Sequence, residues 1–398
     1  VFRLLYFVSL SFVFMKKFTI SLFLLLLIVV GGVYLLGYGY LFKAVRVVYA
    51  TGHSTTFLDD YTYFDNRTIS RSTTPQAWAL TADYNKVAET PELQNAHHKY
   101  GTVAFLIIKG DSIWHECYFD NYNSQSKSNS FSMAKSYVSA LLGRAITDGY
   151  IKGLDQPVSD FFPQYKEGLA AKLTVGDLSS MASGLDWDEA YYDPFSITTR
   201  AYFDGHFREK MLQLKITSEP GKAFKYLSGN TFLLGMVIEK ATGKSLSSYL
   251  AEALWQPMGC EGDALWQLDS EESGLEKAYC CIASNARDFA RLGKLYRDHG
   301  KWNGKQLLDS AFVAKSVQPR FADHPEYGYG WWLLDYKGIH FFMMRGHLGQ
   351  YVIVNPTDKV IIVRLGHSLS DEAPEGSTFS SDIYTYIDEA YKMINGNS

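Results

Sequence analysis

The pattern of hydrophobic and polar positions begins with one long apolar run. Residues 18–42 contain no charged residue, and about 20 apolar residues are enough to cross a bilayer. Lys16 and Lys17 precede this run, which favours a cytoplasmic N-terminus. A secretory signal peptide starts in the same way, but its apolar region is shorter. We therefore expect residues 15–44 to form an uncleaved membrane anchor, with the rest of the protein in the periplasm or at the cell surface. A cleaved signal, which would make the protein secreted, is the alternative.

Strand patterns lie near both ends of the remaining chain, and helical patterns fill its middle. Runs of β-branched and aromatic residues bounded by turn residues predict strands at 102–109, 112–118, 331–335, 339–344, 351–355 and 360–365. Apolar spacings of three and four predict a helix that begins at Ser132 and further helices at 230–241, 246–254, 286–298 and 380–394. This order predicts an α+β fold, in which an antiparallel sheet is flanked by terminal helices and carries an inserted all-helical domain.

The same patterns set the expected domain boundaries. The first methionine is Met15, so we expect residues 1–14 to be upstream sequence. The remaining parts are the anchor or signal, a polar linker or arm (45–94), an α/β domain (95–131 and 270–398) and a helical domain (132–269).

Composition and charge narrow the classes of function. Hydrophobic residues make up 47% of the chain and charged residues 20%, which is typical of a globular protein rather than a disordered one. The 38 lysines and arginines do not exceed the 42 aspartates and glutamates, so we expect no nucleic-acid partner. Four cysteines, at positions 117, 260, 280 and 281, form no CxxC or Cys/His cluster. We expect buried free thiols and no metal site.

The candidate chemistry starts with a Ser-x-x-Lys motif, which occurs twice. A serine hydroxyl needs a base to take its proton, and a lysine three residues later lies on the same helix face. Ser124 and Lys127 fall in a polar stretch without helical periodicity, and we discard that copy. Ser132 opens an amphipathic helix, whose N-terminus favours negative charge at the serine oxygen. We interpret Ser132 as a nucleophile and Lys135 as its base.

A second segment offers further proton-transfer groups. Tyr226-x-Ser228-x-Asn230 precedes an apolar helix. Tyr226 is a candidate second base or proton relay, although core packing is the commoner use of a tyrosine. Either Ser228 or Asn230 is a candidate partner for the lysine.

A third segment joins two of the late strands. It reads Arg345-Gly346-His347-Leu348-Gly349-Gln350. Since glycine lets a backbone approach a ligand closely, His347 and Gly349 are candidates for substrate binding. An edge strand here would present the main-chain N–H of Gln350 as an oxyanion donor beside that of Ser132.

Taken in order, these motifs resemble a known superfamily. Ser132-x-x-Lys135, Tyr226-x-Ser228 and His347-x-Gly349 are similar to the motifs of the serine β-lactamases and penicillin-binding proteins. The closest resemblance is to the class C-like branch, near 6-aminohexanoate-dimer hydrolase and related esterases, and it covers roughly residues 95–395. Segments 173–185, 242–245, 255–259, 301–304 and 327–331 also look like landmarks of this branch.

The resemblance implies a β-lactamase-like fold and a mechanism. Ser132 would attack a carbonyl and form an acyl-enzyme, while Lys135 and Tyr226 would share the proton transfers. The main-chain N–H groups of Ser132 and Gln350 would hold the oxyanion before water releases the acyl group. No metal or organic cofactor is implied.

The chain departs from β-lactam-binding relatives at two places. They usually carry Lys-Thr-Gly where this chain has His347-Leu348-Gly349, and Asn where it has Ser228. A neutral histidine and a leucine replace neither the lysine charge nor the threonine hydroxyl. We therefore expect an amidase or esterase acting on a small molecule or short peptide. A β-lactamase or D-alanyl-D-alanine carboxypeptidase is the first alternative, and a catalytically silent binding domain is the second.

Aromatic and acidic residues are candidates for substrate binding. The resemblance to oligomer hydrolases suggests a carboxylate that faces a substrate ammonium, next to an aromatic wall. The carboxylate candidates are Asp186 and Asp188, and the wall candidates are Trp187, Tyr191, Tyr192, Trp331 and Trp332. Core packing and simple solvation are the alternative for each of them.

Overall fold

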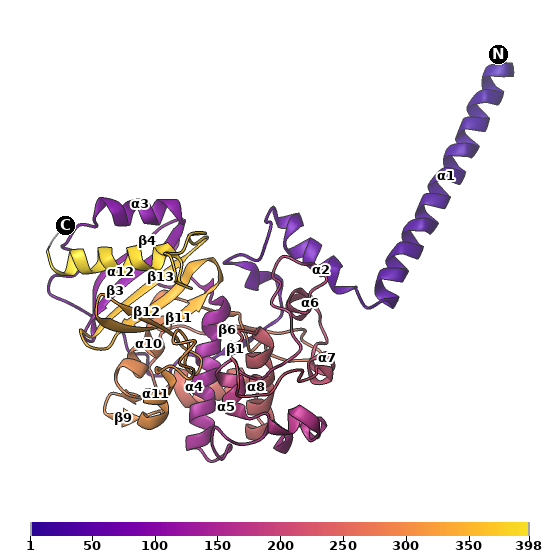
Figure 1. The fold of residues 1–398 in the computed structure, drawn as a ribbon. Coiled ribbons are helices and arrows are strands. Elements are labelled where there is room, and N and C mark those ends of the chain that lie inside the picture. Colours follow the sequence, from indigo (N-terminus) through magenta and orange to yellow (C-terminus); the bar gives the residue numbers. More distant parts are fainter. Residues whose placement is uncertain (1, 397–398) are drawn as a thin grey trace. The chain divides into compact units, whose positions relative to one another are not determined.

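The computed structural model describes residues 2–396 and divides into two compact units, Val1–Ser54 and Thr55–Ser398 (Figure 1). The first unit holds helices α1 (Phe2–Leu35) and α2 (Tyr40–Val47) and a 3-10 turn at Tyr49–Thr51. Its segment Phe14–Leu35 is a 22-residue helix that is long and apolar enough to cross a membrane. The helix ends at Leu35, ahead of a turn in which Gly37 adopts a left-handed φ of 76°. The apolar run predicted as one span to residue 42 is thus shorter as a helix.

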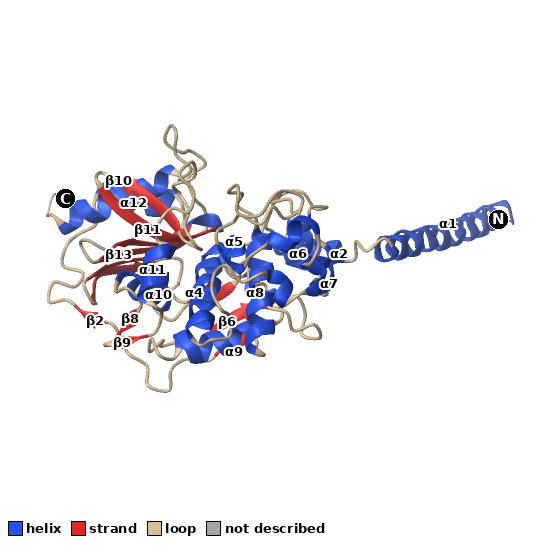
Figure 2. Ribbon diagram, turned by 60° about the horizontal axis from the view of Figure 1, so that its bottom comes forward, coloured by secondary structure: helices blue, strands red, loops and turns tan. Residues whose placement is uncertain are grey.

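The larger unit is organised by a seven-stranded sheet (Figure 2). The strand order is β10-β11-β12-β13-β3-β4-β2. Neighbouring strands are antiparallel except β2 and β4, which are parallel, so the predicted antiparallel sheet is a mixed one. The bounds are β2 Ala79–Leu80, β3 Thr102–Lys109, β4 Ser112–Tyr118, β10 Trp332–Tyr336, β11 Ile339–Gly346, β12 Gln350–Asn355 and β13 Val360–Gly366.

Side chains that alternate between the two faces of the sheet form an apolar layer on each face. Phe105 and Ile107 of β3 and Ile353 of β12 belong to one buried cluster with α12 (Ser381–Ile394) and α3 (Pro91–Lys99). Successive strand residues point to opposite faces, and Val352 and Val354 of β12 accordingly lie against Gly293 of α10 (Ala286–Arg297). The sheet is therefore covered on both faces, which explains why its strands read as nearly continuous apolar runs.

Helices fill the middle of the chain, as predicted. Helix α4 (Ala134–Thr147) packs against α8 (Ser228–Thr242), and α8 packs against α5 (Val175–Ser179). The other helices are α6 Ile197–Phe203, α7 Arg208–Gln213, α9 Leu246–Leu250 with a π-helical turn Ala251–Trp255, and α11 Ser310–Ser316. Short 3-10 turns occupy Asp60–Tyr63, Phe131–Met133, Val158–Asp160, Pro163–Tyr165, Gly168–Lys172 and His347–Gly349.

A second, four-stranded sheet places strands in ranges that were predicted to be helical or a linker. Its order is β1-β6-β7-β5, from Asn66–Ile69, Ala264–Gln267, Ile282–Ser284 and Ser128–Asn129. Strand β6 lies inside the range predicted to be all-helical. Strands β1 and β2 and helix α3 lie mainly in residues 45–94, which were predicted to be a linker or arm. Strands β1, β2 and β6 are strands because they pair with segments distant in the sequence. The local pattern of hydrophobic and polar residues does not indicate such pairings. A small hairpin of β8 (Lys301–Trp302) and β9 (Lys305–Gln306) completes the strands.

Candidate active site

The turn that carries Ser132 is held from both sides. Ser132 lies in the 3-10 turn Phe131–Met133, directly before α4. The Asn129 side-chain oxygen accepts the Phe131 N–H at 2.9 Å, and the Ser130 hydroxyl accepts the Ile282 N–H at 3.0 Å. Phe131 adopts a left-handed φ of 45°, an unusual conformation for a bulky residue that surrounding contacts must maintain. The pairing of β5 with β7 therefore sets the position of Ser132.

Lys135 brings three oxygen atoms together. Its Nζ donates to Ser132 Oγ at 2.9 Å, to Ser228 Oγ at 3.2 Å and to the Tyr279 carbonyl at 2.9 Å. The lysine is 3% exposed, and burial lowers its pKa to about 8. Desolvation disfavours the charged ammonium, so more of Lys135 is neutral near physiological pH than of an ordinary lysine. A neutral amine beside a serine hydroxyl is able to take its proton.

Tyr226 is a second side chain that contacts Ser132. Its hydroxyl is hydrogen-bonded to Ser132, and burial raises the pKa of Tyr226 well above its ordinary value. The ring lies 5.1 Å from that of Trp332, and the Lys135 ammonium lies 5.0 Å from the ring centroid. Since Tyr226 keeps its proton at neutral pH, it is suited to donate a proton rather than to start the reaction as a tyrosinate.

Glu189 is a site residue that sequence reasoning missed. Its carboxylate accepts the Ser228 N–H at 2.7 Å, the Ser228 hydroxyl at 2.5 Å and the Tyr191 hydroxyl at 2.5 Å. The charge of Glu189 raises the pKa of Lys135 and so opposes the effect of burial. Its only signal in the sequence was membership of the acidic, aromatic stretch 186–193, from which Asp186 and Asp188 had been chosen.

The third motif packs directly against the serine turn. A Cβ at Gly346 would lie 2.2 Å from the Ser130 carbonyl oxygen, so only glycine fits there. The His347 ring stacks on Tyr191, with centroids 6.1 Å apart, and meets the Phe131 ring edge-on at 5.5 Å. Burial lowers the pKa of His347 to about 4. His347 is therefore neutral at physiological pH and presents no charge to a substrate.

A buried arginine shapes the turn after His347. Arg364 is fully buried and donates to the carbonyl oxygens of Leu348 and Gly349, at 3.0 and 2.8 Å. Gly349 has a left-handed φ of 80°, and a Cβ there would lie 2.1 Å from Arg364 Nη1. The Gln350 side chain holds the His347 and Gly366 carbonyl oxygens, at 3.0 and 2.7 Å. Gly349, predicted to bind substrate, thus packs on Arg364. The oxyanion role of the Gln350 N–H stays a prediction.

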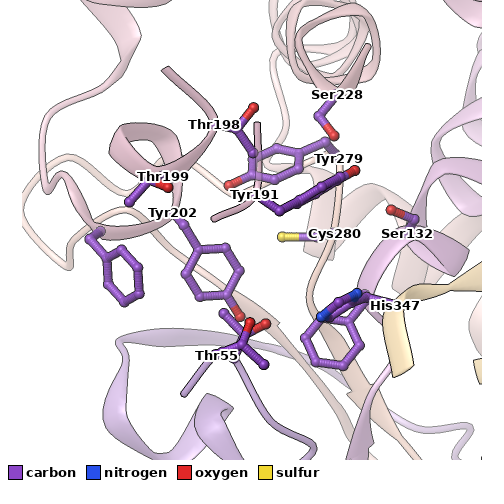
Figure 3. A pocket seen from close by; sticks show the side chains of 13 residues that line it. Thr55, Ser132, Tyr191, Thr198, Thr199, Tyr202, Ser228, Tyr279, Cys280 and His347 are labelled. Atoms are coloured by element: carbon purple, nitrogen blue, oxygen red, sulfur yellow. The ribbon is translucent and has the colours of Figure 1, made fainter. Parts of the chain in front are cut away.

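A cavity of about 60 Å³ opens beside Ser132 (Figure 3). Ser132, Ser228 and His347 line it together with Tyr191, which confirms that the three motifs meet at one space. The other lining residues are Thr55, Thr56, Phe131, Thr198, Thr199, Tyr202, Phe203, Tyr279 and Cys280. Among the described residues that line it, none is an aspartate, glutamate, lysine or arginine. The cavity is therefore aromatic and uncharged.

Several other candidates lie away from this cavity. Trp331 is fully buried between Tyr296 and Phe342, with ring centroids 4.4 and 5.1 Å away, so it belongs to the core. Asn230 is buried, and its amide donates to Met181 Sδ at 3.5 Å; Ser228 is therefore the partner of the lysine. Asp186, Asp188 and Tyr192 are exposed, Trp187 is buried against Phe207 and Tyr279, and Trp332 lies on Tyr226.

The cysteines correct a further expectation. Cys280 and Cys281 form a disulfide between adjacent residues, whereas Cys117 and Cys260 are free. The prediction of four free thiols is wrong for this pair, because Cys281 adopts a left-handed φ of 75° that lets neighbouring sulfurs meet. The disulfide follows Tyr279, whose carbonyl accepts from Lys135.

Comparison with known proteins places the chain in a family. The Beta-lactamase family model matches residues 85–381. The chain belongs to the Beta-lactamase family, whose members related to it are hydrolases of the β-lactamase and penicillin-binding-protein superfamily.

Three relatives illustrate the range of this family. The 6-aminohexanoate-dimer hydrolase of Paenarthrobacter ureafaciens is 26% identical over 234 residues, which cover 56% of this chain and 59% of that protein. Penicillin-binding protein 4 of Amycolatopsis lactamdurans is 22% identical over 322 residues, 69% of this chain and 82% of that one. A Bacillus anthracis structure provisionally described as a 6-aminohexanoate-dimer hydrolase has a TM-score of 0.70 at 21% identity. That alignment covers 83% of this chain and 90% of the other. The structural likeness supports the β-lactamase-like fold.

Proposed function

We propose that the protein is a serine hydrolase that cleaves amide or ester bonds through an acyl-enzyme on Ser132, with an activity similar to that of 6-aminohexanoate-dimer hydrolase. The observation that carries the proposal is the contact of Lys135 Nζ with Ser132 Oγ at 2.9 Å. The lysine is buried and its pKa is lowered to about 8, which suits a base working near neutral pH.

Acylation follows from these contacts. Neutral Lys135 takes the proton of Ser132 as Oγ attacks the substrate carbonyl, and the main-chain N–H groups of Ser132 and Gln350 hold the oxyanion. The tetrahedral intermediate collapses as the bond to the leaving nitrogen or oxygen breaks. Tyr226 gives its proton to that atom and is reprotonated from Lys135. Water then attacks the acyl-enzyme, releases the carboxylic acid and returns the proton to Ser132.

Glu189 acts through Ser228 in this scheme. Ser228 accepts from Lys135 and donates to Glu189, so the three groups form a chain. The carboxylate fixes the Ser228 hydroxyl with its oxygen lone pairs toward Lys135 and stabilises the ammonium that forms during acylation. Glu189 is thus a positioning residue for the proposed base.

The cavity favours a small, uncharged acyl group. It is lined by aromatic rings and hydroxyls, and His347 beside it is neutral. Arg345 packs between Trp332 and Phe379, and its Nη1 donates to the Thr378 carbonyl. His347 therefore supplies no positive charge to a β-lactam carboxylate, and Arg345 does not line the cavity. An amidase or esterase is therefore favoured, and a penicillin-binding-protein-like activity is the second candidate, supported by the relative of that name.

The two Ser-x-x-Lys copies provide a matched test. The full chain is mixed briefly with a p-nitrophenyl ester of a short acyl group, and the intact mass is recorded. We expect one acyl adduct on wild type and on Ser124→Ala, and none on Ser132→Ala. Loss of a helix-start serine costs at most about 2 kcal/mol, so that variant should still fold, as circular dichroism would check. An adduct on folded Ser132→Ala would overturn the proposal.

We also propose that the helix Phe14–Leu35 anchors the enzyme in a membrane, with the hydrolase on the non-cytoplasmic side. The support is the length and apolar character of the helix and the two lysines before residue 18. In cells that express the full chain, we expect the protein in a carbonate-resistant membrane fraction and its larger unit accessible to added protease. Recovery of the intact chain in the soluble fraction would refute the anchor.

A further inference from the structure

A second cluster of reactive side chains lies where α3 meets β4. It consists of Glu89 just before α3, His97 in the last turn of α3, and Cys117 in β4. One ligand atom from each of these residues lies within 4.8 Å of the others. His115, two residues before Cys117 on the same strand, places its Nε2 2.9 Å from Glu89 Oε1. None of these residues belongs to the site around Ser132.

The cluster leaves a negative charge without a fixed cation. The Glu89 side chain is 11% exposed, and among the described residues its ion-pair partners are His97 and His115 alone. Both are histidines, which carry a charge only when protonated. A carboxylate taken out of water needs a compensating charge or full hydrogen bonding, and a divalent cation would supply the charge.

His97 aims an unpartnered nitrogen at that carboxylate. The residue is 4% exposed, and its Nε2 has no hydrogen bond. That nitrogen lies 3.7 Å from Glu89 Oε1, which is too long for a hydrogen bond. The opposite ring nitrogen, Nδ1, lies 3.1 Å from the Thr102 hydroxyl. A hydrogen bond on the far nitrogen is the usual arrangement for a metal-binding histidine, because it sets the ring orientation and the tautomer.

The donor set suits zinc, and so does the separation of two of the three ligand atoms, all of which lie within 4.8 Å of one another. Two ligand atoms bound tetrahedrally to one Zn²⁺ at about 2.0–2.3 Å lie about 3.3–3.8 Å apart, and the 3.7 Å separation of His97 Nε2 and Glu89 Oε1 falls in this range. Thiolate and imidazole together favour Zn²⁺ over Mg²⁺ or Ca²⁺. Cys117 is partly exposed, which leaves an entry path from solvent.

We propose that Glu89, His97 and Cys117 bind one Zn²⁺, with water as the fourth ligand, and that this ion ties α3 to strand β4 of the sheet. Binding forms a sulfur–zinc bond and releases the Cys117 thiol proton to solvent. The carboxylate and the thiolate then balance the two charges of the ion. His115 holds Glu89 in place from outside the coordination sphere, as partners of ligating carboxylates commonly do. Spacing along the chain did not indicate this site, because Glu89 lies just before α3 and His97 in its last turn, whereas Cys117 comes from β4, beyond the intervening strand β3.

The test uses the full chain in detergent micelles, stripped of metal with a chelator and kept free of thiol reductants. Titration with Co²⁺ should give one equivalent bound, with the near-ultraviolet thiolate-to-cobalt band and the strong visible bands of a tetrahedral site. One equivalent of Zn²⁺ should abolish both bands and raise the melting temperature, since it binds the folded state.

Two variants and one control make the result specific. Cys117→Ser should lose the thiolate band, and Glu89→Gln should weaken Co²⁺ binding at least about 10-fold. Cys260→Ser removes the other free cysteine, which is buried, and should leave the spectrum unchanged. Absence of stoichiometric binding by wild type, or an unchanged thiolate band in Cys117→Ser, would overturn the proposal. If Cys117→Ser does not fold by circular dichroism, wild-type affinity in folded Glu89→Gln would overturn it equally.

Discussion

Two copies of Ser-x-x-Lys lie eight residues apart, and their surroundings differ completely. Among the described residues, no hydrogen bond or ion pair joins Ser124 to Lys127, and both lie in a loop with its turn at residue 124. Ser132 and Lys135 are in direct contact, and Lys135 is buried beneath three oxygen acceptors. The comparison teaches that the motif provides only the residue types. Burial lowers the pKa of Lys135, and the fold places its amine against the Ser132 hydroxyl; the other copy has neither feature.

Replacing each lysine by methionine should give the largest difference in hydrolysis rate between the two copies of the motif. Lys135→Met removes the proposed base and should lower kcat/KM about 10³-fold, within the usual range for general-base catalysis. Lys127→Met should leave hydrolysis unchanged. Steady-state hydrolysis of a p-nitrophenyl ester measures both. An equal response of the two variants would show that position in the fold does not distinguish the copies.

Tyr226→Phe tests whether Tyr226, the second side chain hydrogen-bonded to Ser132, protonates the leaving group. An amine leaving group needs a proton, whereas p-nitrophenolate leaves without one. We expect about a 10²-fold loss of kcat on an amide substrate and less than about a 10-fold loss on the p-nitrophenyl ester of the same acid. Equal losses on both substrates would argue that Tyr226 does not protonate the leaving group.

Glu189→Gln should give the smallest effect, and it should be visible mainly as a pH shift. In wild type the acylation rate should rise with pH and level off above a pKa of about 8, the value to which burial lowers Lys135. Glu189 favours the ammonium form, so its removal should lower the pKa of Lys135 further and move the rise to lower pH.

The amide keeps the size of Glu189 and one acceptor oxygen for Ser228, but its NH2 group cannot accept the second of the two bonds that Ser228 donates. We therefore expect only about a 10-fold fall in the plateau rate, measured as single-turnover acylation across the pH range. A rise that stays in place or moves to higher pH would show that Glu189 does not act on Lys135 through its charge. A matched control is Asp188→Asn, which changes a nearby exposed carboxylate.

Most strands and helices of the larger unit were predictable, because their patterns are local. The strands at 102–109 and 360–365 and the helix at 286–298 lie within a residue of their observed bounds. The short strands β1 and β6 were not predictable, since β1 pairs with the distant β6, and β6 pairs with both β1 and β7. Residues 45–94 therefore looked like a linker, although β1 and β2 are strands of the two sheets.

The candidate site divides in the same way. Ser132, Lys135 and Tyr226 stand in recognisable motifs, so the family and the proposed chemistry could be predicted from the order of residues alone. The folded structure was needed to show that Lys135 donates to Ser228 and that Ser228 donates to Glu189. It was also needed to show that Trp331 belongs to the core. Arg364 beneath Gly349, and the Glu89, His97 and Cys117 cluster, were also decided by the fold. The physical reason is distance along the chain. A motif consists of residues close together in the sequence. Burial, charge balance and hydrogen-bond partners instead depend on segments that are far apart in the sequence and meet only in the folded protein.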